Sequence, residues 1–115
     1  MPPDERVDLA VEVFRMLADA TRVKLLWALF HGGEASVNHL ATAVTKPQTA
    51  VSQHLAKLRM ARMVTTRRQA NQVFYRLAND HVRQLVEDGI NHAEHVGPGV
   101  PAHHQSVLSR GKKAR

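Results

Sequence analysis

Five of the chain's eight histidines lie in its last 35 residues, and their spacing is typical of a shared metal site. These five are His81, His92, His95, His103 and His104. A helix turns by about 100° per residue, so His92 points within roughly 20° of the direction of His81. His95 lies one turn beyond His92, which makes their rings neighbours. Because neutral imidazole is the commonest metal ligand in proteins, this stripe indicates metal binding.

A single helix cannot close such a site around one ion. At about 1.5 Å of rise per residue, His81 and His92 lie roughly 16 Å apart along the helix axis. Two copies of the helix that run antiparallel remove this separation, since His81 of one copy then faces His92 and His95 of the other. The spacing therefore predicts a metal site and a two-fold homodimer together.

The composition indicates one small helical domain without disulfides. A chain of 115 residues has room for one modest core, and only 4% of its residues are aromatic, which favours helices over a sheet sandwich. The absence of cysteine excludes disulfides and thiolate metal ligands. No apolar run approaches the roughly 20 residues that span a bilayer, and the acidic N-terminus does not look like a signal peptide. We expect a cytoplasmic protein without a membrane partner.

Basic residues are concentrated in the middle of the chain, whose formal net charge is +6. Between Glu34 and Asp80 there is no acidic residue. The same stretch contains Lys46, Lys57, Arg59, Arg62, Arg67, Arg68 and Arg76. An acid-free basic centre predicts a phosphate-binding face, although a solvated basic surface would have the same composition. No activated nucleophile or glycine-rich phosphate loop is evident, so we expect neither an enzyme nor a small organic substrate.

The order of the expected elements predicts a winged helix-turn-helix. Apolar residues at helical spacing predict helices over residues 4–17, 22–30, 37–44, 47–60 and 79–96. In the second of these, Val23, Leu26, Trp27 and Phe30 are expected to face the core. Two β-rich segments, 64–68 and 72–77, flank a polar turn and predict a hairpin. The expected fold is thus mainly α with a β-hairpin wing over residues 1–96, followed by a flexible tail over residues 97–115.

The fourth helix is the expected DNA-reading element. In a helix-turn-helix, the N-terminal residues of the second helix contact base edges in the major groove, and the hairpin positions the protein on the backbone. Glutamine reads adenine, and serine and threonine bind bases or phosphates. The candidate residues on this helix are Gln48, Thr49, Ser52, Gln53, His54 and Lys57, with His54 expected at a phosphate. The candidates on the hairpin are Arg67 and Arg68.

Four segments together resemble the ArsR/SmtB family of bacterial metal-responsive repressors. They are Phe14–Arg22, Ser36–Ala41, Val51–Leu58 and Val73–Leu77. The resemblance covers roughly residues 8 to 104 and is greatest to actinobacterial nickel/cobalt sensors of the KmtR type, with the NmtR type as a further relative. It implies a homodimer that binds an inverted-repeat operator in double-stranded DNA and releases it when metal binds. It also implies that the regulated gene encodes a metal exporter.

The resemblance implies two family metal sites that are incomplete in this chain. The first is missing, and the second lacks one ligand. One site uses two cysteines at the start of the third helix, where this chain has Ser36 and Asn38, so thiolate sensing is excluded. The other is a zinc-type site on the last helix, whose aspartate position is Asn79 here. Of that second set the chain retains His81, His92 and His95.

A third ligand set, implied by the resemblance to the KmtR type, is complete. It consists of His81, Glu94, His95, His103 and His104. Nitrogen and oxygen ligands without sulfur suit an octahedral ion such as Ni²⁺ or Co²⁺ better than tetrahedral Zn²⁺, which stays an alternative effector. His92 is either an additional ligand or a hydrogen-bonding partner of one. Of the histidines outside the stripe, we place His31 at a helix end and His39 on the surface.

Three other functions stay open at this point. The alternatives to a nickel/cobalt sensor are a metal-independent regulator of the same family, a zinc-responsive sensor that uses the last-helix site, and a metal buffer that binds no DNA. The acid-free basic centre and the wing argue against the buffer, because a buffer needs neither.

Overall fold

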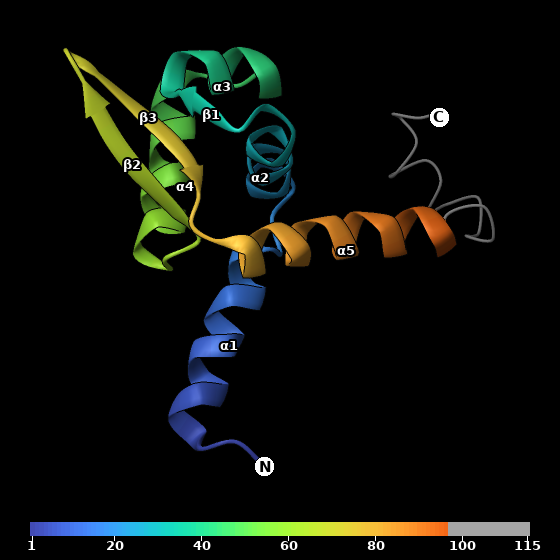
Figure 1. The fold of residues 1–115 in the computed structure, drawn as a ribbon. Coiled ribbons are helices and arrows are strands. Elements are labelled where there is room, and N and C mark those ends of the chain that lie inside the picture. Colours follow the sequence, from blue (N-terminus) through green and yellow to red (C-terminus); the bar gives the residue numbers. More distant parts are fainter. Residues whose placement is uncertain (97–115) are drawn as a thin grey trace.

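The computed structural model describes residues 1–96, which form five helices and one three-stranded antiparallel sheet (Figure 1). The elements are α1 (Asp4–Met16), α2 (Ala20–Gly32), β1 (Glu34–Ser36), α3 (Val37–Val44), α4 (Gln48–Met60), β2 (Val64–Gln69), β3 (Gln72–Leu77) and α5 (Asp80–Val96). The predicted winged helix-turn-helix is confirmed, with α3 and α4 as the helix pair and β2–β3 as the wing. The predicted tail, including His103 and His104, lies outside the described residues.

The short strand β1 is the element that the sequence analysis missed. It pairs antiparallel with β3, with Glu34 opposite Arg76 and Ser36 opposite Phe74, and the strand order in the sheet is β1-β3-β2. Three residues are too few to show the alternation of apolar and polar side chains by which a strand is recognised. Its position matters because it joins the end of α2 to the wing.

The core lies between α2, α3, α4 and the base of the wing. Its fully buried side chains are Leu25, Leu26, Leu29, Leu40, Val51, Leu55, Leu58, Met63 and Val64. The prediction for α2 was therefore only partly right. Leu26 is buried as expected, but Val23, Trp27 and Phe30 are only half-buried. Because α2 packs against α3, α4 and β3, its leucine face is the innermost, and its aromatic side chains lie at the border of the core.

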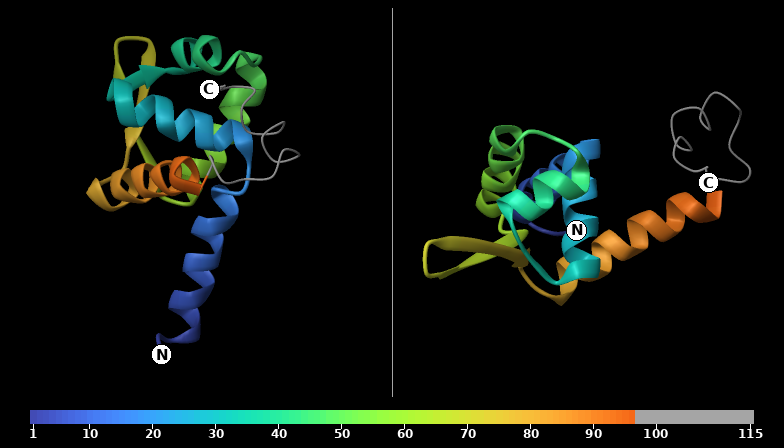
Figure 2. Two further views of the ribbon diagram at one scale, coloured as in Figure 1. Left: turned by 90° about the vertical axis from the view of Figure 1, so that its right-hand side faces the viewer. Right: turned by 90° about the horizontal axis from the view of Figure 1, so that it is seen from above.

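Helices α1 and α5 project from this body in different directions (Figures 1 and 2). In α1 only Met16 is buried, whereas Leu9 is 69% exposed and Phe14 is 61% exposed. In α5 only Val86 is buried. Within residues 1–96, both helices thus leave apolar side chains exposed, among them Leu9 and Phe14 of α1 and Val96 of α5. None of the helices within residues 1–96 combines the length and the apolar character that a membrane crossing requires.

Short-range hydrogen bonds fix the starts of two helices. The carboxylate of Asp19 accepts a hydrogen bond from the backbone N–H of Arg22 at 2.9 Å and caps α2. The hydroxyl of Ser36 accepts one from the backbone N–H of His39 at 3.2 Å and caps α3. After α2 the chain turns through Gly33, whose φ of 85° is a conformation that glycine adopts without strain.

We predict that the cap at Asp19 contributes to stability in a pH-dependent way. The hydrogen bond from Arg22, together with the positive charge of Arg22, lowers the pKa of Asp19 from its ordinary value of 3.8. Asp19→Ala should lower the free energy of unfolding by about 1 kcal/mol at neutral pH. Because the folded-state pKa is the lower one, the contribution of the charge is present above pH 3.8 and is lost as the pH falls through the folded-state value.

Urea unfolding at neutral pH and at acidic pH measures this effect. Asp19→Asn is the matched control, since asparagine caps a helix about as well as aspartate but does not titrate. The wild type should lose more stability on acidification than the Asp19→Asn variant does. Equal losses in the two proteins would show that the charge of Asp19 makes no contribution.

Candidate metal centre and nucleic-acid interface

The histidine stripe lies on the open side of α5. The helix begins after Asn79, whose side-chain oxygen accepts a hydrogen bond from the backbone N–H of Val82 at 3.0 Å. Val82 and Val86 turn the opposite side of the helix toward the core. The side chains that α5 leaves exposed include His81, His92, Glu94 and His95. The candidate ligands within the described residues therefore all face away from their own chain's core.

These ligands do not meet within one chain. Among residues 1–96, no three His, Cys, Asp or Glu side chains come together in a group that could hold a metal ion. The rise of the helix accounts for this, because it separates His81 from His92 by roughly 16 Å. A metal site on this face would therefore need ligands from a second copy of α5 or from residues beyond 96.

The helical geometry separates the two ligand sets that the sequence left open. Two residues turn a helix by about 200°, so His92 and Glu94 lie on opposite sides of His95. An ion bound by His95 is therefore close to His92 or to Glu94, but not equally to both. Substituting these two side chains separately distinguishes the zinc-type set from the KmtR-type set.

Asp88 is a candidate that the sequence analysis did not consider. It is exposed and lies seven residues from both His81 and His95. Seven residues bring a helix back to within about 20° of the same direction, so the three side chains lie along one face. Its Oδ1 accepts a hydrogen bond from Nε2 of Gln84 at 2.9 Å. The seven-residue spacing was the signal that could have revealed it. It adds a carboxylate to the face that carries the imidazoles.

The three positions where the family ligands are replaced have structural roles in this chain. Ser36 caps α3, and Asn79 makes the equivalent contact at the start of α5. The side-chain oxygen of Asn38 accepts a hydrogen bond from Nε2 of Gln48 at 2.8 Å, which ties α3 to the start of α4. These side chains stabilise helix ends and the turn, in agreement with the absence of a thiolate site there.

The recognition helix α4 presents a polar face to solvent. Its buried face is made by Val51, Leu55 and Leu58. The exposed candidates for DNA contact on this helix are Gln48, Thr49, Ser52, Gln53 and Lys57. No acidic side chain occurs on α4, so nothing on this helix repels a phosphate backbone. Gln48 is already hydrogen-bonded to Asn38, which orients it at the helix start.

His54 differs from the other candidates on α4 because its side chain is partly buried. It is half-buried, with Nδ1 3.4 Å from the guanidinium of Arg22 and 3.9 Å from the carboxylate of Asp19. Arg22 is itself buried, and its Nε donates a hydrogen bond to the carbonyl oxygen of Met16 at 2.8 Å. The phosphate contact expected for His54 is less well supported than a role in joining α4 to the turn between α1 and α2.

An ion pair joins β1 to the middle of the wing strand β2. Nε of Arg67 donates to the Glu34 carboxylate at 2.7 Å, and the guanidinium lies 4.8 Å from the centre of the Phe74 ring. The hydrogen bond from Arg67 lowers the pKa of Glu34, and the same bond raises the pKa of Arg67. Arg68, the next residue, is exposed. Of the two predicted wing contacts, Arg67 is therefore already engaged with a carboxylate.

Comparison with known proteins identifies the family. Residues 19–66 match the arsR family of bacterial regulatory proteins. The HTH-type transcriptional regulator KmtR of Mycobacterium tuberculosis is 64% identical over 105 residues, which cover 91% of this chain and 80% of that protein. The chain belongs to the arsR family. It is a regulator of transcription and not an enzyme, as the sequence predicted.

Other relatives agree with this assignment. The HTH-type transcriptional repressor SmtB of M. tuberculosis is 39% identical over 92 residues, covering 80% of this chain and 67% of that protein. The antimony-specific repressor AntR superposes with a TM-score of 0.73 at 32% identity, over 84% of this chain and 86% of its own. The homodimeric winged helix-turn-helix DNA-binding domain of Mb0332 from M. bovis gives a TM-score of 0.73 at 26% identity. The match covers 82% of this chain and 88% of that one. The arsR-family chain thus has the fold of homodimeric DNA-binding regulators.

We predict that Glu34 limits the affinity of the wing for DNA. Glu34→Gln removes the charge that competes with phosphate for Arg67, so the variant should bind duplex DNA several-fold more tightly at low salt. One additional phosphate contact steepens the dependence of log affinity on log salt by about 0.9. Fluorescence anisotropy over a range of salt concentrations measures both quantities.

Glu12→Gln is the matched control for this prediction. Glu12 makes an exposed ion pair of the same kind with Arg15 at 2.8 Å, on α1 and away from the wing. It should leave the salt dependence unchanged. If Glu34→Gln also left the slope unchanged, Arg67 would not be a phosphate contact that Glu34 restrains.

Proposed function

We propose that this arsR-family chain is a metal-sensing transcriptional repressor. As a homodimer it binds an inverted-repeat operator, and it releases that operator when Ni²⁺ or Co²⁺ binds. The observation that carries the proposal is the stripe of exposed imidazoles on α5, which forms no complete metal site within residues 1–96 of one chain. Because one copy of residues 1–96 holds no complete site, a metal that binds these ligands also has to bring in a second chain or residues beyond 96.

The exposed apolar faces support the dimer. Large exposed apolar patches on a soluble protein mark interaction surfaces. On α1 these side chains are Val7, Leu9, Val11 and Phe14, and at the end of α5 there is Val96. A second copy related by a two-fold axis covers the same helices on both chains with one interface. An antiparallel pair of α5 helices also places His81 of one copy beside His95 of the other.

The chemistry of the donors fits Ni²⁺ or Co²⁺. The described residues supply His81, Glu94 and His95, and His103 and His104 follow beyond residue 96. Imidazole and carboxylate groups without sulfur suit these ions. Zn²⁺ is the alternative, held by His81, His92 and His95. When bound, the ion supplies fixed bonds among groups from α5 and the following segment.

The relatives point to effectors of the same general kind. AntR is an antimony-specific repressor, and a Staphylococcus aureus relative is a cadmium-resistance regulatory protein. This chain has no cysteine, so its effector is one that binds imidazole and carboxylate. As the resemblance implies, the controlled gene encodes a metal exporter, and the protein acts in the cytoplasm.

Repression depends on the distance between the two recognition helices. Helix-turn-helix dimers read half-sites about 34 Å apart, so a dimer whose α4 helices suit that spacing binds tightly. A metal that prefers another arrangement of the α5 helices shifts the population away from the DNA-binding form. Linkage then requires that DNA weakens metal binding by the same factor by which metal weakens DNA binding.

The first test is anisotropy of the wild-type protein on its own upstream DNA, without metal and with Ni²⁺, Co²⁺ or Zn²⁺. Ni²⁺ or Co²⁺ should weaken binding about tenfold or more. His81→Ala should bind metal-free DNA normally and lose the response, because it removes a ligand that both sets share. His39→Ala is the control, since His39 is exposed but lies on α3. Wild-type binding that no metal changes would favour the metal-independent regulator, and metal binding without DNA binding would favour the buffer.

A second test separates the two ligand sets. For a Ni²⁺ or Co²⁺ sensor of the proposed type, Glu94→Gln should weaken metal binding about tenfold or more, while His92→Ala should have a smaller effect. Isothermal titration with each metal measures this. The reverse order would support the zinc-type set instead. Truncation after Gly99 tests whether His103 and His104 are ligands. If metal weakens DNA binding of the truncated chain as much as that of the wild type, they are not.

A further inference from the structure

A cation–π contact and a hydrogen bond join the first turns of α5 to the end of α2. Nη2 of Arg83 donates to the carbonyl oxygen of Phe30 at 3.3 Å. The same guanidinium lies 4.7 Å from the centre of the Phe30 ring. Arg83 follows the candidate ligand His81 by two residues. It therefore connects the start of the histidine helix with the winged helix-turn-helix body.

The end of α2 is a compact aromatic cluster. Phe30 stacks on Trp27 with ring centroids 5.2 Å apart and an interplanar angle of 15°. His31 packs edge-on against both rings, at 4.4 Å from Trp27 and 5.3 Å from Phe30. Stacked and edge-on aromatic contacts of this kind favour one arrangement of the rings. A displacement of Arg83 therefore acts on a cluster and not on one loose side chain.

The same end of α2 leads directly into the wing. The helix ends at Gly32, and β1 begins at Glu34. Glu34 holds Arg67 of β2 through the 2.7 Å ion pair. Contacts thus run from α5 through Arg83 to Phe30, and then along a few residues of backbone to the ion pair at the wing. All of these contacts form within a single chain and need no partner.

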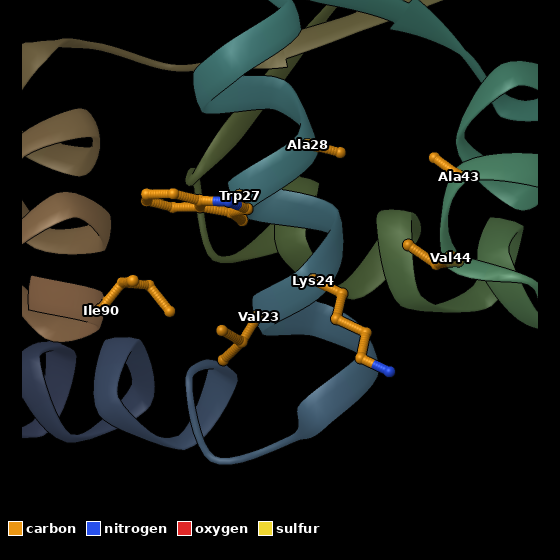
Figure 3. A pocket seen from close by; sticks show the side chains of 7 residues that line it. All are labelled: Val23, Lys24, Trp27, Ala28, Ala43, Val44 and Ile90. Atoms are coloured by element: carbon orange, nitrogen blue, oxygen red, sulfur yellow. The ribbon is translucent and has the colours of Figure 1, made fainter. Parts of the chain in front are cut away.

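Further along, α5 borders open space. A groove of about 270 Å³ has α2 as its floor, with Ile90 of α5 on one side and Ala43 and Val44 of α3 on the other (Figure 3). Trp27 lines this groove and also belongs to the aromatic cluster. Helix α5 contacts the body through Val82, Arg83 and Val86, and Ile90 borders the groove.

We propose that Arg83 is the positioning residue through which α5 controls the winged helix-turn-helix. The inference rests on the proposed metal-sensing function. It assigns the coupling between the metal site on α5 and the DNA-binding body to the contact of Arg83 with Phe30. When metal fixes the crossing of two α5 helices, Arg83 moves with its helix and displaces Phe30, the end of α2 and β1. Only arginine combines a planar face for stacking with several donors, so lysine cannot replace it here.

The test compares three proteins: the wild type, Arg83→Lys and Phe30→Leu. Arg83→Lys keeps the charge but loses the stacked, hydrogen-bonded guanidinium, and Phe30→Leu removes the ring from the other side. Both should keep metal-free operator affinity and Ni²⁺ affinity close to wild type. The factor by which Ni²⁺ weakens operator binding should fall by about fivefold or more in each. The double variant should lose no more than either single variant, because both remove the same contact.

Trp27 provides a second readout that needs no DNA. It is the chain's single tryptophan, so the emission reports on the surroundings of Trp27, which are the aromatic cluster and the adjoining groove. We expect the emission maximum of Trp27 to shift when metal binds the wild type, and not when metal binds Arg83→Lys. Arg6→Lys is the matched control, since it makes the same chemical change at an exposed position on α1. It should respond like the wild type in both measurements.

The outcomes separate this inference from the proposed function. A wild type that no metal affects overturns both. A wild type that responds, with Arg83→Lys and Phe30→Leu responding equally, overturns only the role of Arg83. Sedimentation velocity completes the test. Loss of the dimer in Arg83→Lys would overturn the positioning role by showing that Arg83 acts in assembly.

Discussion

The rigidity of α5 is the constraint on which the rest of the proposed mechanism depends. A helix holds His81 and His92 on one face but keeps them roughly 16 Å apart along its axis. A metal site formed entirely within one chain would report nothing about how two chains are arranged. A site completed across two crossing helices does, because binding the ion and fixing the crossing angle are then the same event. In the proposed mechanism, the separation that prevents a single-chain site is thus what links the metal to the DNA.

This linkage requires a body that stays folded while its outer helices change position. The fully buried side chains come from α2, α3, α4 and the strand base, whereas α1 contributes only Met16 and α5 only Val86. The core therefore depends mainly on α2, α3, α4 and the strands, because α1 and α5 each add a single buried side chain. A change at the dimer interface can then alter the distance between two recognition helices without a large loss of folding stability.

Local patterns made most of the fold predictable, and long-range contacts account for what was missed. Helix α3 was predicted with its observed bounds because the Ser36 cap and the turn at Pro47 are local signals. The exposed histidine face followed from helical periodicity alone. The inward face of α2 was predicted less well, since hydrophobicity cannot tell Leu29 from Phe30 without knowing what packs on each side. The contacts of Arg67 with Glu34 and of Arg83 with Phe30 span 33 and 53 residues, and no local pattern encodes either.

Charge alone cannot explain the proposed release of DNA, and this favours a geometric switch. A divalent cation adds positive charge to a protein whose formal net charge is already +6, and DNA is a polyanion. By Coulomb's law that addition would strengthen binding, although salt screens exposed charges beyond about 8 Å at physiological ionic strength. Metal-dependent release therefore has to come from repositioning the groups that already contact DNA. The ion pair between Glu34 and Arg67 fits this view, because the position of Glu34 is set by the pairing of β1 with β3. A small movement of that strand changes how freely Arg67 reaches a phosphate, and it does so without any change in the net charge of the protein.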